Sequence, residues 1–321
     1  MPSRAATPPS PELSVVVTVT SGGHHVEDCL KVLLAQLDAA DAPRVEILVP
    51  VDASVSGLAG WAERFPSVRF PEVPGETPSA DDPGSAHLAY DRRRATGLAA
   101  ARAPILALTE DHARPAPDWC RSILAAHRRL PHAALGGAID NASHETLTWA
   151  VYFSDFGRYQ SPLPEGPAAY VSDVNVSYKR APLLEVATSW RGTYHETAVH
   201  AALKARGGTL WRVPEITVQQ ARGKLSLGPV LRERFAWGRL YAGKRAHEEP
   251  PGKRWLVALG APLLPPLLLA RQLRHTVARG RNLRPFLRAL PALTLLLCWW
   301  SAGEAVGLWT GRPSRRERQR S

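Results

Sequence analysis

A run of acidic and imidazole side chains follows an apolar stretch near the middle of the chain. Leu108–Trp119 reads LTEDHARPAPDW, so a strand-like segment leads directly into Glu110, Asp111 and His112, and a proline-rich turn follows. Mg²⁺ and Mn²⁺ bind oxygen ligands, and Mn²⁺ accepts an imidazole more readily. The run therefore predicts a divalent-cation site for a diphosphate, and a charged strand end that only meets solvent is the alternative.

A second acidic side chain falls at the start of an expected helix. The segment Glu196–Ala205 is predicted to be helical and to end at Gly207 and Gly208, which supply the positive φ that helix ends favour. Glu196 follows His195 in the first turn, where the helix dipole and free N–H groups tend to keep a carboxylate ionised. Such a carboxylate can act as a general base, although first-turn acids without a catalytic role are common.

The elements that must position these side chains alternate between strand-like and helical patterns. Strands are predicted at Leu13–Thr20, Val45–Val51, Val68–Val73, Pro104–Thr109 and Ala133–Ile139, and helices at Val26–Ala39, Ser56–Phe65, Ala86–Ala101 and Asp118–Arg129. The alternation indicates an α/β fold with a mostly parallel sheet flanked by helices. Asp52 and the cluster Glu110–His112 follow the carboxyl ends of predicted strands, where such sheets bind ligands.

Four stretches, between about Leu13 and Arg245, resemble the family 2 glycosyltransferases of the GT-A fold. They read SVVVTVTSGGHHVEDCLKVLLAQ, VPVDAS, RRRATGLAAARAPILALTEDHARP and NVSYKRAPLLEVATSWRGTYHETAVHAALKARGGTLWRVP. The resemblance implies a GT-A-like domain that transfers a sugar, with inversion, from a nucleotide diphosphate donor. It also implies a divalent cation, Mn²⁺ or Mg²⁺, as the cofactor.

The resemblance assigns roles residue by residue. It implies that Asp52 binds the nucleobase and that Glu110 and His112 replace the two metal-binding aspartates, with Asp111 between them. Glu196 stands at the position of the catalytic base and Asp173 is the alternative base, while His195 and Asn175 are assigned to the acceptor side. The segment RERFAWGRLYAGKR replaces a diphosphate-binding element of the family, which implies donor contacts for Arg234 and Arg239.

Further arginines could bind phosphate through their charge. Arg102 and the run Arg92–Arg94 could bind phosphate or could solvate a helix face. We assign Arg102 to donor binding and interpret the run as a solvated face.

The net charge of +11 is concentrated at one end of the chain. Residues 222–321 contain 20 Lys or Arg against 5 Asp or Glu, whereas residues 1–221 contain 20 against 24. A basic segment with apolar runs favours an anionic membrane surface. Nucleic acid is the rival partner, but the segment has no recognisable nucleic-acid module, and none is expected to bind.

Two apolar segments lie in this basic region. Trp255–Ala270 is short and contains three prolines, and Ala289–Ala302 reaches spanning length only if Glu304 is tolerated. Arginines lie between and after them, so we expect two interfacial or re-entrant helices, with a soluble helical hairpin as the alternative.

These patterns divide the chain into a disordered leader (1–11), a GT-A-like catalytic domain (12–246) and a basic, apolar, membrane-associating region (250–321). The leader lacks the apolar stretch of a signal peptide, so the expected location is the cytoplasmic face of the cell membrane. We expect an inverting glycosyltransferase with a lipid-linked or membrane-presented acceptor. The alternatives are a polyprenyl-phosphate glycosyl transferase and a catalytically impaired relative that acts as a membrane scaffold.

Overall fold

The computed structural model describes residues 10–20, 23–37, 43–55, 60–75, 83–246 and 258–311. Nearly all of the predicted leader, the first residues of the predicted helix at Ser56–Phe65 and the basic end of the chain lie outside these ranges.

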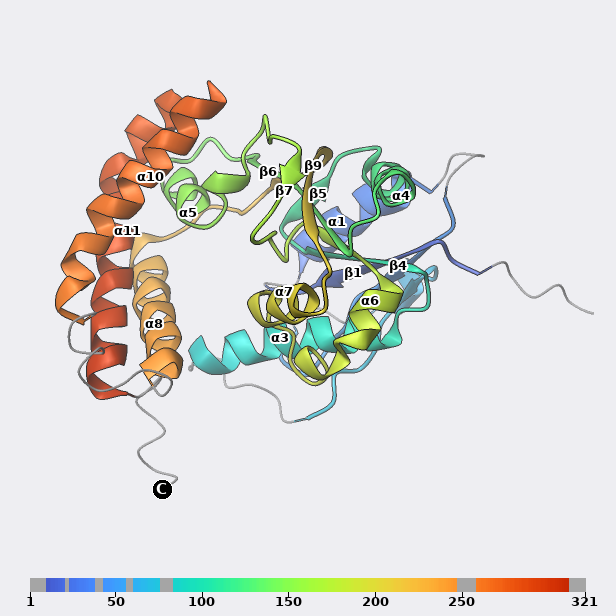
Figure 1. Ribbon diagram of the computed structural model, residues 1–321. Helices are drawn as coiled ribbons and strands as arrows, with labels where there is room; N and C mark the ends of the chain where they lie inside the picture. The colour runs from blue at the N-terminus through green and yellow to red at the C-terminus, as the bar shows by residue number, and fades with distance from the viewer. Residues whose placement is uncertain are drawn as a thin grey trace, which may run out of the picture. The chain divides into compact units, whose positions relative to one another are not determined.

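A nine-stranded mixed sheet forms the centre of the fold (Figure 1). Its strand order is β3-β2-β1-β4-β8-β6-β9-β5, and β7 pairs with β9. The neighbours β3, β2, β1 and β4 are parallel, whereas β8 joins both β4 and β6 in antiparallel pairs. The strands are β1 (Leu13–Thr18), β2 (Val45–Leu48), β3 (Val68–Arg69), β4 (Ile105–Glu110), β5 (Ala113–Pro115), β6 (Ala134–Asn141), β7 (Gly166–Pro167), β8 (Val176–Lys179) and β9 (Leu210–Gln220).

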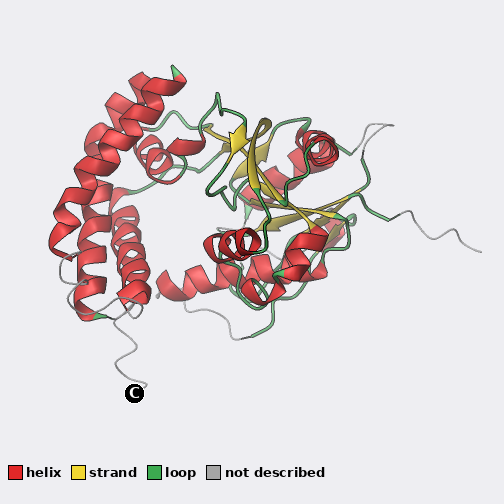
Figure 2. Ribbon diagram, viewed as in Figure 1, coloured by secondary structure: helices red, strands yellow, loops and turns green. Residues whose placement is uncertain are grey.

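Helices flank this sheet, and the predicted α/β fold class is confirmed (Figure 2). The predicted helix at Glu196–Ala205 has the predicted bounds, whereas the helix expected from Ala86 begins at Pro83. The helices are α1 (His24–Ala35), α2 (Trp61–Arg64), α3 (Pro83–Ala100), α4 (Trp119–Arg129), α5 (Thr146–Asp155), α6 (Arg180–Glu185), α7 (Glu196–Ala205), α8 (Leu227–Ala246), α10 (Leu264–Arg279) and α11 (Leu283–Thr310), with 3₁₀ turns η1 (Gly157–Tyr159), η2 (Ala187–Ser189) and η3 (Ala261–Leu263).

Helix α3 packs directly on the parallel part of the sheet. An added Cβ at Gly97 would lie 2.3 Å from Cγ1 of Val16 on β1 and 2.9 Å from Cγ of Pro50. Only glycine allows this approach, because any side chain would overlap the strand. The connection between parallel strands β1 and β2 runs through α1, and that between β3 and β4 runs through α3. Right-handed crossovers in opposite directions along a sheet place these two helices on opposite faces.

The chain divides into two compact units, each described here by itself. The first comprises residues 1–77, 89–138 and 162–219 and contains most of the sheet with α1, α4, α6 and α7. The second comprises residues 78–88, 139–161 and 220–321 and contains α5, α8, α10 and α11. The predicted segmentation at 246–250 does not coincide with this division, since α5 and α8 belong to the second unit.

Glycines bring α8 and α11 together in the second unit. An added Cβ at Gly238 would lie 2.2 Å from the carbonyl oxygen of Trp300, and one at Gly303 would lie 2.1 Å from that of Phe235. The two backbones therefore approach more closely than side chains would allow. Helix α11 also packs on α5, and Glu304 is buried within it.

Helix α11 is long enough and, with a mean hydropathy of 1.3 over its most apolar window, apolar enough to cross a membrane. The buried core helix of a soluble protein can have the same length and hydropathy. Among the described residues α11 is the one helix of that kind. The apolar segment predicted at Ala289–Ala302 is its middle, and the helix continues through Pro291.

Candidate active site

Side chains of helix α3 donate hydrogen bonds to groups at the carboxyl ends of the parallel strands. The Tyr90 hydroxyl donates to Oε2 of Glu110 at 2.7 Å, at the end of β4. The Arg93 guanidinium donates to Asp52 beyond β2, with Nε–Oδ2 at 2.8 Å, and to the carbonyl oxygen of Val19 beyond β1 at 2.7 Å. Glu110 and Thr18 are partners in the parallel register, so these contacts share one edge of the sheet.

Asp52 is held ionised at this edge. Its side chain is 9% exposed and accepts hydrogen bonds from both Arg93 and Ser54. Burial alone raises the pKa of Asp52, but the hydrogen bonds from Arg93 and Ser54 outweigh it and lower the pKa. Asp52 thus lies beyond the carboxyl end of β2 and is paired with the buried Arg93. Its contact with a nucleobase stays a prediction.

The residues Glu110, Asp111 and His112 do not converge as three ligands. Glu110 turns to Tyr90 on α3, whereas Oδ1 of Asp111 accepts from the backbone N–H of Thr20 at 3.0 Å and from its hydroxyl. The His112 ring lies 4.2 Å from that of His25, measured between centroids. Strand β4 ends at Glu110, and Asp111 and His112 lie in the turn before β5, so strand alternation does not fix their directions.

The donor set of this triplet does not fit a three-ligand cation site as it stands. Oε1 of Glu110 is buried and has no hydrogen-bond partner among the described residues, so one carboxylate oxygen remains for a ligand. Within the described ranges, however, the triplet does not form a group of convergent ligand atoms. The cation site predicted at Glu110, Asp111 and His112 therefore stays a prediction.

A second buried arginine, Arg94, lies on helix α3. The Arg94 side chain is 2% exposed, and its guanidinium lies 3.6 Å from the centroid of the Tyr90 ring. It forms an ion pair with Asp173 and lies 3.8 Å from Oδ1 of Asp91. Burial by itself lowers the pKa of Arg94, but Asp173 and the other acidic groups around it raise the pKa, so the guanidinium is charged.

Glu196 completes this cluster at the first turn of α7. Burial and the negative charge of Asp173 raise its pKa to about 7, while Arg94 and a backbone hydrogen bond act in the opposite direction. The helix terminus was expected to keep Glu196 ionised, but its effect on the pKa is smaller than that of burial and Asp173. The helix contribution exists, but desolvation outweighs it.

The loop before Glu196 is anchored on two sides. The backbone N–H of Tyr194 donates to the carbonyl oxygen of Asp91 at 3.1 Å, and the Tyr194 and Tyr178 hydroxyls lie 2.6 Å apart. His200 continues this buried network, with Nε2 at 2.9 Å from the Tyr178 hydroxyl. The anchoring fixes the start of α7 against α3 and β8.

His195 lies against α3 as well. Its Nε2 is 3.0 Å from Oδ2 of Asp91. This His–Asp pair offers an imidazole nitrogen and a carboxylate oxygen, both of which are possible ligands of a divalent cation. The sequence did not predict this pair, although His195 itself was assigned to the acceptor side.

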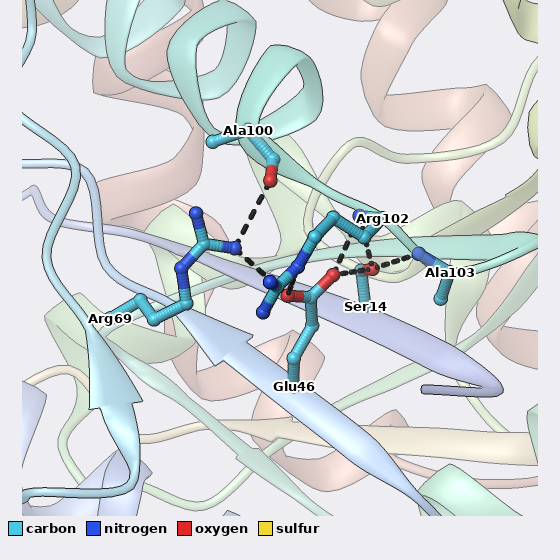
Figure 3. A network of polar contacts seen from close by, with 6 residues as sticks. All are labelled: Ser14, Glu46, Arg69, Ala100, Arg102 and Ala103. Atoms are coloured by element: carbon cyan, nitrogen blue, oxygen red, sulfur yellow. Dashed lines mark hydrogen bonds and ion pairs between the residues drawn. The ribbon is translucent and has the colours of Figure 1, made fainter. Parts of the chain in front are cut away.

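One predicted site residue, Arg102, lies away from this edge. Arg102 precedes β4, at the amino ends of the parallel strands, where it donates to Glu46 from both its backbone N–H and its side chain (Figure 3). Arg69 and Ser14 also donate to Glu46, and these hydrogen bonds lower its pKa despite burial. The structure therefore does not bring Arg102 together with Asp52 or Glu110, and its predicted role as a donor ligand is not supported by its position.

Asn175 has a packing role in the sheet. Its Nδ2 donates to the carbonyl oxygens of Ala138 and Ile216 at 2.8 and 2.9 Å, and its Oδ1 accepts from Nε1 of Trp119 at 2.9 Å. The side chain is 1% exposed. These bonds occupy both amide protons, and the predicted acceptor contact of Asn175 stays a prediction.

Arg234 and Arg239 belong to the second unit. Arg234 is 2% exposed and forms a two-pronged ion pair with Asp155, with Nη2–Oδ2 at 2.8 Å. Burial alone lowers the pKa of Arg234, and Asp155 raises it. The pair ties α8 to α5 inside that unit, so the donor contact predicted for Arg234 and Arg239 stays a prediction.

Most of the contribution of α3 to the site was not predicted from the sequence. The run Arg92–Arg94 was interpreted as a solvated helix face, yet Arg93 and Arg94 are both buried in ion pairs. Three consecutive residues span about 200° of a helix and cannot share one solvated face. This rotation could have indicated from the sequence that at least one of the three arginines is buried. Tyr90 and Asp91 gave no comparable signal.

No known protein family matches the sequence, and no curated protein matches it. Among solved structures, the chain is similar to the mannosyltransferase PcManGT from Pyrobaculum calidifontis, solved in complex with GDP-Man and Mn²⁺. The two share 18% sequence identity with a TM-score of 0.51, over 94% of this chain and 88% of that one. The likeness shows that this chain has a glycosyltransferase-like fold.

Proposed function

We propose that the protein is an inverting glycosyltransferase that moves a sugar from a nucleotide diphosphate donor to an acceptor hydroxyl. The observation that carries the proposal is the buried cluster of Glu196, Arg94 and Asp173 in a glycosyltransferase-like fold. Within this cluster the pKa of Glu196 is raised to about 7. A general base works best when its pKa is near the working pH. The mannosyltransferase with a similar fold, whose complex contains a nucleotide sugar, supports the donor class.

In the proposed reaction, the Glu196 carboxylate takes the proton of the acceptor hydroxyl. The acceptor oxygen forms a bond to the anomeric carbon, and the bond from that carbon to the diphosphate oxygen breaks. The nucleoside diphosphate leaves with the electron pair, on the face opposite the attack, so the configuration inverts. Asp52 would bind the nucleobase, with Arg93 holding its carboxylate in place.

A divalent cation would neutralise the charge of the leaving diphosphate. Mn²⁺ is present in the complex of the similar mannosyltransferase. In this chain Glu110 offers one free oxygen, and Asp91 with His195 offers an oxygen and a nitrogen. Because these groups do not form the predicted triplet, we derive no step through a cation, and metal dependence is a measurement to be made.

We further propose that the acceptor is lipid-linked or presented at a membrane, with the protein on the cytoplasmic face. Helices α10 and α11 each expose apolar and basic side chains. Leu263 at the end of η3 is 71% exposed, Leu267 on α10 is 64% exposed, and Leu287 on α11 is 55% exposed. The exposed arginines of these helices are Arg271, Arg274, Arg284 and Arg288. Apolar residues flanked by arginines are typical of helices that lie in a membrane interface.

The proposal is tested by Glu196→Gln, which keeps the shape of the side chain and removes its basicity. Loss of a general base lowers kcat by about 10²–10⁴-fold with little effect on donor binding. Glu215→Gln, at an exposed position on β9, is the matched control and should leave kcat unchanged. Donor binding is measured as a thermal shift over a panel of nucleotide sugars, with and without Mn²⁺, because a bound ligand raises apparent stability.

Two outcomes would contradict the proposal. Near-normal turnover of Glu196→Gln, or a product that retains the donor's anomeric configuration, removes Glu196 from the mechanism. Donor binding without any transfer or donor hydrolysis in the unaltered protein would favour the catalytically impaired scaffold.

A further inference from the structure

A cavity of about 530 Å³ lies on another face of α3, within the first unit. One wall is the helix face formed by Arg92, Ala95, Thr96 and Ala99, which recur at helical spacing. The facing wall comes from the start of α6 and from the loop after η2. Arg180 stands at the amino-end edge of β4, where its backbone N–H donates to the carbonyl oxygen of Pro104, so the cavity extends away from Glu110 and Asp52.

The cavity has an apolar floor. Trp190, Leu98 and Ala95 are each less than 4% exposed and line it from below. The Trp190 indole is fixed by its Nε1, which donates to the carbonyl oxygen of Leu183 at 2.9 Å. A floor of this kind favours an aromatic ring or an aliphatic chain over a fully hydrated ion.

The rim of the cavity is cationic. Arg92, Arg180 and Arg191 all line it, and none of the described lining residues is acidic. The guanidinium of Arg92 lies against Gly75, where an added Cβ would be 3.2 Å from Nη1. The absence of a side chain at Gly75 therefore leaves room for the guanidinium. Arginine pairs with phosphate oxygens through two parallel hydrogen bonds, which makes a phosphate group the natural partner of this rim.

We propose that this cavity is a binding site for an organic phosphate ester, with the phosphate at Arg92, Arg180 and Arg191 and the apolar part on Trp190. The volume is within the range of small-molecule sites, about 300–1,000 Å³. The site is separate from the proposed donor site, since it uses a different face of α3 from Arg93 and Arg94. The inference does not depend on the proposed glycosyl transfer.

The shared chemistry could come from a lipid-like ester or from a ring-bearing metabolite, and two probes separate these sources. Octyl phosphate, below its micelle concentration, represents the first, and benzyl phosphate the second. Binding to the full chain is measured by titration calorimetry without any nucleotide sugar. We expect at least one ester to bind about tenfold or more tightly than inorganic phosphate, because the apolar part adds burial on Trp190. The tighter of the two identifies the source.

Two variants and a control assign the binding to this cavity. Arg180→Gln with Arg191→Gln should weaken ester binding by about tenfold for each arginine. Ala99→Trp, on the helix wall of the cavity, should place an indole ring in part of the cavity and weaken binding without disturbing the core. Arg206→Gln, an exposed arginine at the end of α7, is the charge-matched control and should bind as the unaltered protein does.

The proposal is overturned if neither ester binds more tightly than inorganic phosphate. It is equally overturned if Ala99→Trp retains full ester binding, because the ligand would then lie elsewhere. Both results leave the test of Glu196 untouched, since no donor and no turnover enter this experiment.

Discussion

Arg94 controls the ionisation of Glu196 in our interpretation, and Arg94→Met tests this directly. The substitution removes the guanidinium of a side chain that is 2% exposed and leaves an apolar chain about as long as the aliphatic part of arginine. Arg94 lowers the pKa of Glu196, so its loss should raise that pKa further above the ordinary value. Asp173 and Glu196 would then share a buried site without a cation.

The expected size follows from the pKa of about 7. Loss of a nearby opposite charge shifts a pKa by about 1–3 units, and the lower end gives a minimum expected effect. The pKa of Glu196 then rises to about 8, and at pH 7 its ionised fraction falls from about one half to about one tenth. The turnover number at pH 7 should fall about fivefold from ionisation alone and recover near pH 9.

The assay is the pH dependence of kcat from pH 6 to 9.5, with Arg206→Met as the control. Asp173→Asn makes the opposite prediction, because Asp173 raises the pKa of Glu196. Its removal should move the acid limb to lower pH. If Asp173 were itself the base, Asp173→Asn would instead lose turnover at every pH.

Stability provides an independent readout of the same ion pair. Removing one partner of a buried pair costs about 3–5 kcal/mol, and Asp173, 20% exposed, places this case near the lower end. Urea denaturation at pH 8 measures the free energy of unfolding. An acid limb that does not move in Arg94→Met, together with unchanged stability, would refute the reasoning.

Further predictions concern the ligand edge, the packing of α3 and the membrane surface. Asp52→Ala should weaken binding of the nucleoside monophosphate as well as the diphosphate; loss of only diphosphate affinity would show that Asp52 does not contact the base. Gly97→Ala should lower the free energy of unfolding by about 1–3 kcal/mol because its Cβ would overlap Val16, whereas Gly228→Ala, with open space around it, should cost nothing measurable. Leu267→Glu should reduce sedimentation with anionic vesicles, and the remaining binding should weaken with salt. Retention of the full chain on vesicles after carbonate would favour a spanning α11.

Hydrophobic periodicity and strand composition determine much of the fold. Buried parallel strands such as Leu13–Thr18 read as continuous apolar runs, and the helix at Glu196–Ala205 is bounded by local signals at both ends. Parallel strands also place their carboxyl ends together, so the location of Asp52 and Glu110 at one edge followed from topology. Local sequence was sufficient here because these features depend on neighbours a few residues away.

Tertiary structure alone decided what the charged side chains do. Arg93 and Asp52 are 41 residues apart, and Arg94 meets Asp173 across 79 positions, so no local pattern pairs them. The rotation of about 100° per helical residue directs Arg93 to Asp52, Arg94 to Asp173 and Arg92 to the wall of a cavity. The pKa of Glu196 was likewise decided by desolvation and by Asp173, because burial is a property of the packed chain and not of the helix end.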